Sequence, residues 1–280
     1  MSAPTPRLLE NNADPSRALR IAECGLRTRC SDFSEIRNLQ SEILARCITM
    51  MDVAAIVPAA GLGRRFKGTV NKLFASLGGE PLLACTLRVL QESSRIRWIV
   101  LVVHPKLRNQ ARAFAKRYQI TKALLPCSGG SSRAESVMRG FAAIPREAKW
   151  VLVHDGARPC VSGRLITESV RMARRYGAVA CGLPAGVTVK YVDRRSSVSL
   201  TLNREQLWFA QTPQVFRRDW FAQALAQADH NLEQFPDDAA ILESAGFPVK
   251  MILGEPLNLK VTTQDDLLLA EAILKRRTSG

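Results

Sequence analysis

The sequence predicts an α/β fold, a Rossmann-like and mostly parallel sheet flanked by helices. Short runs of small and β-branched apolar residues, typical of buried parallel strands, occur at 53–57, 99–103 and 151–153. Segments of helical period at 81–93 and 106–118 lie between them. Strands that alternate with helices at this spacing form βαβ units, whose strands lie parallel in one sheet.

The composition fits a soluble globular protein that binds small anions. The chain has 280 residues, 46% hydrophobic and 23% charged, and no apolar run approaches the roughly 18 residues of a membrane span. Its net charge of +15 fits nucleic acid, an anionic membrane surface or phosphorylated substrates. Because the basic residues are scattered and few aromatic residues accompany them, we expect phosphorylated substrates, and neither nucleic acid nor a membrane. Nucleic-acid binding is the second candidate on charge alone.

The cysteines indicate a reducing compartment. Seven are scattered along the chain, with no C-x-x-C pair and no histidine at metal-ligand spacing. We therefore expect reduced thiols that act as small core residues, in a cytoplasmic protein.

The first fifty residues stand apart from the rest. They lack the apolar core of a secretory signal, and their acidic residues argue against an organellar transit peptide. We expect a disordered extension or an artefact of start-site assignment, with the functional domain at 51–280.

The stretch 53–72, VAAIVPAAGLGRRFKGTVNK, has the pattern of an anion-binding loop. Pro58 is expected to end the strand, because proline cannot donate to a sheet ladder. The small residues that follow let backbone N–H groups approach an anion, and basic residues come after them. A P-loop would need a lysine followed by Ser or Thr, and Phe66 replaces the third glycine of a dinucleotide loop. An ordinary strand-to-helix turn with surface arginines is the alternative.

Two further segments belong to the same part of the predicted fold. Residues 127–137, CSGGSSRAESV, are glycine-rich, and local pattern alone also allows a flexible helix-capping loop. The strand at 151–153 ends in HDGARP, where Asp155 is either a buried partner of Arg158 or faces metal and substrate hydroxyls. Ligands of such sheets bind at the carboxyl ends of the strands.

Residues 184–216 do not continue the alternation of strands and helices. Alternating residues at 187–191 and 198–202 flank a turn at 193–196 and predict a hairpin. Two strands alone are marginally stable in water, so the hairpin needs a partner, either a second subunit or the edge of the same sheet.

The C-terminal part returns to helices and a strand. Helices are predicted at 220–228, 239–245 and 264–275, and a strand at 249–253. Asp237 and Asp238 precede the second of these helices, where acidic side chains suit an N-cap and the positive helix end.

The motifs of this chain resemble those of one enzyme family. PAAGLGRRF followed by NKL is similar to the loop of nucleotidyltransferases that couple a sugar or polyol phosphate to a nucleoside triphosphate. HDGARP, NREQLWFAQTPQ and NLKVT resemble more specifically the 2-C-methyl-D-erythritol 4-phosphate cytidylyltransferases of the non-mevalonate isoprenoid pathway. The resemblance runs from about Met51 to the C-terminus, and departs from the family where Gly156 replaces the usual alanine and Pro236 the usual threonine.

The resemblance implies transfer of CMP from CTP to 2-C-methyl-D-erythritol 4-phosphate, which gives 4-diphosphocytidyl-2-C-methyl-D-erythritol and pyrophosphate. It implies Mg²⁺ or another divalent cation, with no protein residue assigned to the metal. It also implies a homodimer in which a β-arm, at about 184–210, clasps the second subunit.

The resemblance also implies roles for individual residues. Arg65 and Lys72 would stabilise the transition state, while Lys260 and the partner's Arg204 would hold the attacking phosphate. Arg158 and Thr188 would join Arg204 and Lys260 at the acceptor substrate. The implied nucleotide contacts are Ala59, Ala60, Gly61, Leu62, Gly63, Arg64, Gly129, Ser131, Ser136, Asp155 and Gly156. Two alternatives stay open: a cytidylyltransferase for another polyol phosphate such as ribitol phosphate, and a non-enzymatic polyanion-binding protein.

Overall fold

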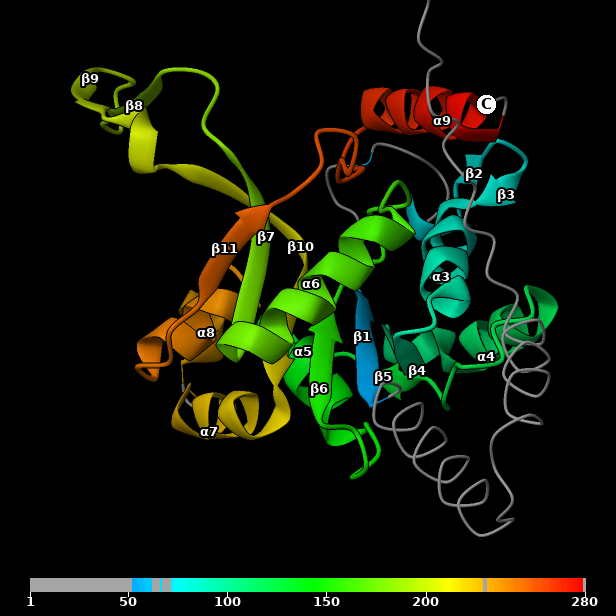
Figure 1. Ribbon diagram of the computed structural model, residues 1–280. Coiled ribbons are helices and arrows are strands. Elements are labelled where there is room, and N and C mark those ends of the chain that lie inside the picture. Colours follow the sequence, from blue (N-terminus) through cyan, green and yellow to red (C-terminus); the bar gives the residue numbers. More distant parts are fainter. Residues whose placement is uncertain (1–51, 62–65, 67–71, 229–230, 279–280) are drawn as a thin grey trace, which may run out of the picture. The chain divides into compact units, whose positions relative to one another are not determined.

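The computed structural model of the chain describes residues 52–61, 66, 72–228 and 231–278. The leader predicted at 1–50 lies outside these residues. The strands of the main sheet are β1 (Val53–Ala59), β4 (Ile96–Val103), β5 (Cys127–Ser128), β6 (Trp150–Val153), β7 (Ala178–Pro184), β10 (Trp208–Arg217) and β11 (Lys250–Leu253). Within the described part they lie in the order β11-β7-β10-β6-β1-β4-β5 (Figure 1).

The sheet is parallel except at one strand. β6, β1, β4 and β5 run parallel to their neighbours, and so do β7 and β11. β10 runs antiparallel to both β6 and β7, between which it lies. The predicted mostly parallel α/β sheet is therefore confirmed, with one reversed strand that the sequence analysis did not assign.

Helices cover both faces of this sheet. The side chains of Val53, Ala55 and Val57 belong to a core formed with α3 (Leu82–Glu92), α4 (Arg108–Arg117), α6 (Gly163–Tyr176) and α9 (Gln264–Thr278). Ala54 and Ile56 belong to a second core, formed with α5 (Arg133–Ala142), α7 (Arg218–Ala228) and α8 (Asp238–Ser244). Successive residues of a strand point to opposite faces, so a strand buried on both sides reads as the continuous apolar run seen in the sequence.

The predicted helices at 81–93, 106–118, 220–228, 239–245 and 264–275 are confirmed as α3, α4, α7, α8 and α9, with ends that differ by a few residues. The short elements are the 3-10 turns η1 (Lys72–Phe74), η2 (Pro105–Leu107), η3 (Arg204–Gln206) and η4 (Leu232–Gln234), and the strand pair β2 (Ser76–Leu77) and β3 (Glu80–Pro81). None of the helices in the described ranges is long and apolar enough to cross a membrane.

Pro58 does not end the first strand, contrary to the prediction. β1 continues to Ala59, and Pro58 is in register with Val102 of β4. On its other side, β1 pairs with β6 only as far as Ile56. The ladder on that side therefore needs no N–H group from Pro58, and the proline is tolerated within the strand.

Helix α6 is the largest element that the sequence analysis left unassigned. The side chain of Ser162 accepts a hydrogen bond from the Leu165 N–H and caps its first turn. The helix ends at Gly177, whose φ of +89° lies in the left-handed region. A Cβ at this position would lie 2.3 Å from the ring of Trp220, so both the backbone conformation and the packing require glycine here.

The predicted hairpin forms a separate arm made of β8 (Val189–Val192) and β9 (Val198–Leu202). Among the residues that the structure describes, these strands pair only with each other, and they lie apart from the main sheet (Figure 1). The alternative that the hairpin is an edge of the same sheet is therefore wrong. Apolar side chains of the arm are exposed, among them Tyr191 at 65% and Leu200 at 55%.

Candidate active site

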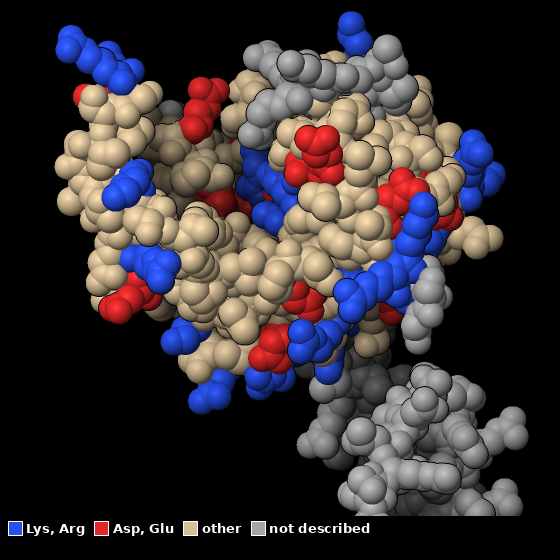
Figure 2. Space-filling view, turned by 90° about the horizontal axis from the view of Figure 1, so that it is seen from above, with Lys and Arg blue, Asp and Glu red and all other residues tan. Residues whose placement is uncertain are grey.

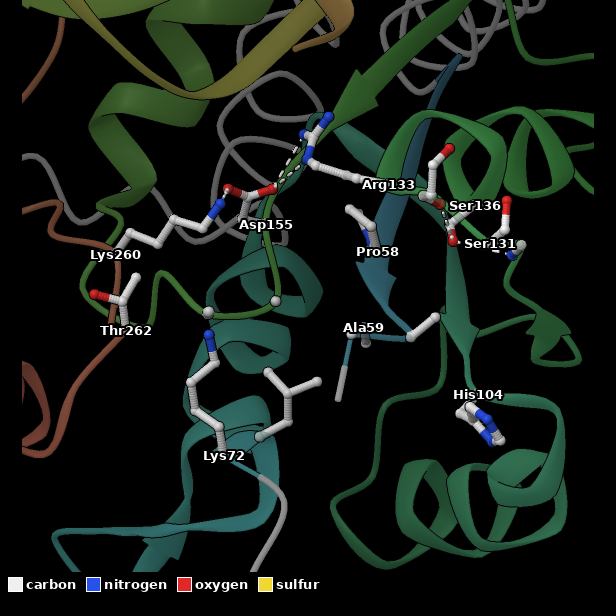
Figure 3. A pocket seen from close by; sticks show the side chains of 17 residues that line it. Pro58, Ala59, Lys72, His104, Ser131, Arg133, Ser136, Asp155, Lys260 and Thr262 are labelled. Atoms are coloured by element: carbon white, nitrogen blue, oxygen red, sulfur yellow. Dashed lines mark hydrogen bonds and ion pairs between the residues drawn. The ribbon is translucent and has the colours of Figure 1, made fainter. Parts of the chain in front are cut away.

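A cavity of about 630 Å³ lies at the carboxyl ends of β1, β4, β5 and β6. Its lining comes from the segments that follow these strands, together with the loop before α9. Residues that line it include Ala59, Ala60, Gly61, Lys72, His104, Gly130, Ser131, Arg133, Ser136, Asp155, Gly156, Lys260 and Thr262 (Figure 3). Figure 2 shows basic side chains inside a hollow of the surface. The volume is in the range of small-molecule sites, and the position is where α/β sheets bind ligands.

Most of the predicted site residues that the structure describes meet at this cavity. Those that line it are Ala59, Ala60, Gly61, Lys72, Ser131, Ser136, Asp155, Gly156 and Lys260. Gly129 lies directly beside the lining, next to Gly130 in the chain and close to Ala60, and its N–H donates to the carbonyl of Val103 at 2.8 Å. The predicted residues Leu62, Gly63, Arg64 and Arg65 lie outside the described residues.

Three predicted substrate residues do not line this cavity. Thr188 and Arg204 are exposed at the base of the arm, and the Arg204 guanidinium donates to the carbonyl of Gly186 at 3.2 Å. Arg158 is buried, with 8% of its surface exposed, and its guanidinium donates to the carbonyl of Asn258 at 2.8 Å. This contact ties the β6 loop to the loop that carries Lys260.

The glycine-rich segment is held in shape by its own side chains. The Ser136 hydroxyl accepts from the Gly130 N–H at 3.0 Å and donates to the carbonyl of Ser132 at 2.8 Å. The carboxylate of Glu135 accepts from the Ser131 N–H at 2.6 Å and from its hydroxyl at 2.8 Å. The hydroxyl proton of Ser136 is therefore engaged within the segment and is not free for a ligand. The Ser136 hydroxyl instead fixes the conformation of the segment, whose backbone faces the cavity.

Asp155 lies at the centre of a group of cations. One of its oxygens accepts from Nε of Arg133 at 3.1 Å, and the other contacts Nζ of Lys260 at 2.7 Å. Nε of Arg158 is farther away, at 3.8 Å from the second oxygen. Burial alone would raise the pKa of Asp155, but the charges of Arg133 and Lys260 outweigh it and hold this pKa well below its usual range. Asp155 thus both faces the cavity and is paired, and its main partners are not the predicted Arg158.

A chain of buried hydrogen bonds fixes the backbone at Asp155. The Asp155 N–H donates to Oγ1 of Thr212 at 3.1 Å, and this hydroxyl lies 3.0 Å from Nδ1 of His154. Nε2 of His154 lies 3.2 Å from the carbonyl of Arg158. The network assigns the proton to Nε2, because Nδ1 then accepts from Thr212 and Nε2 donates to the carbonyl. Burial lowers the pKa of His154 to about 4, so its imidazole is neutral at pH 7.

Comparison with known proteins agrees with this geometry. A model of the family described as 2-C-methyl-D-erythritol 4-phosphate cytidylyltransferase matches residues 53–276. The chain belongs to this family. The resemblance inferred from the sequence motifs is confirmed, and as a 2-C-methyl-D-erythritol 4-phosphate cytidylyltransferase family member the chain is a nucleotidyltransferase.

The alignments with individual relatives extend over nearly the whole length of each relative. The chain is 42% identical over 227 residues to the 2-C-methyl-D-erythritol 4-phosphate cytidylyltransferase of Geobacillus thermodenitrificans, an alignment that covers 81% of this chain and 99% of the relative. It is similar to a crystal structure of the 4-diphosphocytidyl-2C-methyl-D-erythritol synthase from Anaerococcus prevotii, with a TM-score of 0.72 and 27% identity over 82% and 99% of the two chains. The crystal structure of the cytidylyltransferase from Thermus thermophilus gives a TM-score of 0.65 and 30% identity over 80% and 100%.

The sequence analysis did not predict the ion pair of Arg133 with Asp238 beside the cavity. Arg133 lies in the glycine-rich segment and pairs with both Asp155 and Asp238. Asp237 caps α8, as predicted, because its side chain accepts from the Ala240 N–H at 3.0 Å. Asp238, predicted to share this role, is fully buried against Arg133 instead. A sequence signal for this pair was present, because a helix needs only one N-cap residue and the second acid, Asp238, therefore calls for another partner.

The residues of the site fit a cation that enters with the nucleotide. Among the described residues, no group of three or more His, Cys, Asp or Glu side chains is placed to hold a metal ion. The described lining offers one carboxylate, Asp155, whose oxygens already accept from Arg133 and Lys260. Mg²⁺ is commonly bound through substrate phosphates and water with few protein ligands, and this donor set is compatible with that mode.

Proposed function

We propose that this chain transfers CMP from CTP to 2-C-methyl-D-erythritol 4-phosphate and releases pyrophosphate. Membership of the family supports the reaction. The observation that carries the proposal is the convergence of Lys72 and Lys260 on one cavity beside a small-residue loop at the end of β1. Such an arrangement suits two phosphorylated substrates, because cations and backbone N–H groups meet at one place.

The reaction needs positioning and charge rather than a base. An oxygen of the acceptor's phosphate monoester attacks the α-phosphorus of CTP, while the bond between this phosphorus and the bridging oxygen to the β-phosphate breaks. The electron pair leaves with pyrophosphate. The nucleophile is already an anion, so no protein group has to remove a proton.

Lys72 and Lys260 have separate parts in this scheme. Lys72 reaches the cavity from η1 and stabilises the charge that builds on the α-phosphate and on the leaving pyrophosphate, together with Arg65. Lys260 reaches the cavity from the loop before α9 and holds the acceptor phosphate in line. The Val261 N–H donates to the carbonyl of Ala157 at 2.8 Å and ties this loop to the one that carries Asp155.

The nucleotide is held by two loops that touch each other. The loop at 59–64 receives the phosphates on its backbone, and the segment with Gly129, Ser131 and Ser136 receives the cytosine base. Asp155 and Gly156 complete the nucleotide site from the end of β6. A divalent cation such as Mg²⁺, held by the triphosphate oxygens of CTP, would neutralise part of the phosphate charge.

The acceptor site is completed by a second subunit. The arm exposes Tyr191 and Leu200, and two strands of this kind are marginally stable alone. In a homodimer the partner would cover this surface, and its arm would bring Arg204 and Thr188 to the cavity that each subunit leaves open. The scattered cysteines support a cytoplasmic location.

The test is pyrophosphate release from the purified protein with CTP and Mg²⁺. We expect release with 2-C-methyl-D-erythritol 4-phosphate and none with ribitol phosphate or without an acceptor. Release only with ribitol phosphate would show that the proposed acceptor is wrong but that the reaction is still a cytidylyl transfer. If a folded dimer releases no pyrophosphate with any acceptor, the proposed enzymatic activity is refuted and a polyanion-binding protein is favoured. That alternative is tested by measuring nucleic-acid binding, which should depend steeply on salt concentration.

A further inference from the structure

Four charged side chains from distant parts of the chain form a continuous row beside the cavity. Asp238 is the first residue of α8, and Arg133 the first residue of α5. Asp155 follows β6, and Lys260 lies in the loop before α9. Figure 3 shows Arg133 and Lys260 reaching Asp155 from opposite sides.

The inner end of this row is fixed. Asp238 has none of its surface exposed, and its two oxygens accept from the two terminal nitrogens of Arg133 at 3.0 and 2.9 Å. This is the bidentate geometry that gives an arginine–carboxylate pair its specificity. Burial raises the pKa of Asp238, but the adjacent charge of Arg133 opposes this rise and keeps the buried carboxylate paired.

Arg133 uses the rest of its guanidinium on Asp155. Its Nε donates to Oδ1 of Asp155 at 3.1 Å, and one terminal nitrogen lies 3.0 Å from the same oxygen. Oδ2 of Asp155 is left for Lys260, at 2.7 Å. A lysine cannot replace these contacts, because a single ammonium group lacks the planar fork that binds two carboxylates at once.

The removal of Arg133 would disturb this row. Asp155 and Asp238 would lose the cation that lies between them, and Asp238 is too deeply buried to move away. Asp155 would turn toward its remaining cations, Lys260 and the more distant Arg158. The ammonium of Lys260, whose side chain is 37% exposed, would shift with it.

We propose that Arg133, anchored by Asp238, is a positioning residue that holds Asp155 and, through Asp155, sets the place of the Lys260 ammonium for the acceptor phosphate. Arg133 acts on the reaction through Asp155. This inference rests on the proposed function, since it assigns the acceptor phosphate to Lys260.

The first experiment compares Arg133→Lys with the wild type in steady-state pyrophosphate release. We expect kcat/KM for 2-C-methyl-D-erythritol 4-phosphate to fall about 10- to 100-fold, because a displacement on the order of 1 Å can cost about 100-fold. KM for CTP should rise by a smaller factor, because Asp155 also belongs to the proposed nucleotide site but the hydrogen bonds that shape the base-binding segment, from Gly130 to Ser136 and from Ser131 to Glu135, do not use the Arg133 side chain. Equal losses for both substrates, or wild-type kinetics, would overturn the proposal.

The second experiment tests whether Arg133 acts through Lys260. In a Lys260→Ala background, Arg133→Lys should lower kcat/KM less than about threefold, because the group it positions is gone. Multiplicative losses would assign Arg133 an independent or structural role and overturn the proposal. Inactivity of the wild type would instead refute the proposed function, so the two failures are distinguishable.

Matched variants guard against a folding defect. Arg174 has nearly the same side-chain exposure, 29% against 28% for Arg133. It pairs with Asp52, which directly precedes β1 at the end of the strand that lies away from the cavity. Arg174→Lys should therefore keep wild-type kinetics, and an equal loss would overturn the proposal. Asp238→Asn, which replaces one acceptor of the anchoring pair by a donor, should reproduce the Arg133→Lys pattern. Failure of both Arg133→Lys and Asp238→Asn to unfold cooperatively would mark the pair as structural only.

Discussion

Gly129 is where the two proposed nucleotide loops touch, and its replacement by alanine would push them apart. An added Cβ would lie 2.3 Å from Cβ of Ala60 and 2.9 Å from Oγ of Ser136. Carbon atoms pack at about 3.5–4.0 Å, so the first contact is more than about 1 Å too short. Since the φ of Gly129 lies outside the left-handed region, the conflict comes from this contact and not from the backbone.

The expected cost follows from overpacking. Forcing such a group into a packed site costs about 1–3 kcal/mol. Here the strain falls between the phosphate loop and the base loop, so it should appear mainly as weaker CTP binding, by roughly 5- to 150-fold. Isothermal titration calorimetry with CTP in the absence of acceptor measures this directly, with circular dichroism melting as the check on folding.

A compensating variant makes the test specific. The nearest atom is the methyl group of Ala60, so Ala60→Gly combined with Gly129→Ala should restore most of the affinity, whereas Ala60→Gly alone should change it little. Gly163→Ala is the matched control, because a Cβ there meets nothing within 4 Å. Unchanged CTP affinity in Gly129→Ala, or a double variant as weak as the single one, would refute the reasoning.

Three further predictions concern catalysis, stability and assembly. Lys72→Ala should lower kcat about 100-fold, roughly 3 kcal/mol in the barrier, because a preorganised cation is lost; near-wild-type turnover in a folded variant contradicts this. The pKa of His154 lies at about 4 when folded against 6.5 in its ordinary state. Its contribution is therefore complete above pH 6.5 and is lost as the pH falls toward 4, by roughly 3 kcal/mol in the free energy of unfolding. His154→Gln should flatten this pH dependence in urea titrations, and an unchanged slope would contradict it. Leu200→Glu should convert a dimer into folded monomers in sedimentation velocity, and a monomeric wild type would disprove the arm's role.

Part of the fold could be predicted because its signals are local. The buried runs of β1, β4 and β6 and the apolar face of α3 repeat within a few residues, so the sequence alone shows their type and order. β10 was not assigned, and nothing within a single strand says that its neighbours β6 and β7 will run opposite to it. The arm was recognised from alternation and a turn, but only the pairing of β8 with β9 alone showed that it is not an edge of the main sheet.

The candidate site likewise contains residues that the sequence could predict and residues that it could not. Lys72, Asp155 and Lys260 lie in motifs of contiguous residues, and all three meet at the cavity. Arg158 belongs to the same motif as Asp155, yet it turns to the carbonyl of Asn258, 100 residues away in the sequence. The direction of a side chain depends on the partners that surround it, and these are not encoded in the motif.

The sequence by itself determined the class of fold and the family, because each depends on residues that are neighbours in the chain. Only the tertiary structure decided how the charges of the site are shared. Arg133 meets Asp155 across 22 residues and Asp238 across 105. The physical reason is that a buried carboxylate must find a cation wherever the fold brings one, and sequence separation sets no limit on that choice.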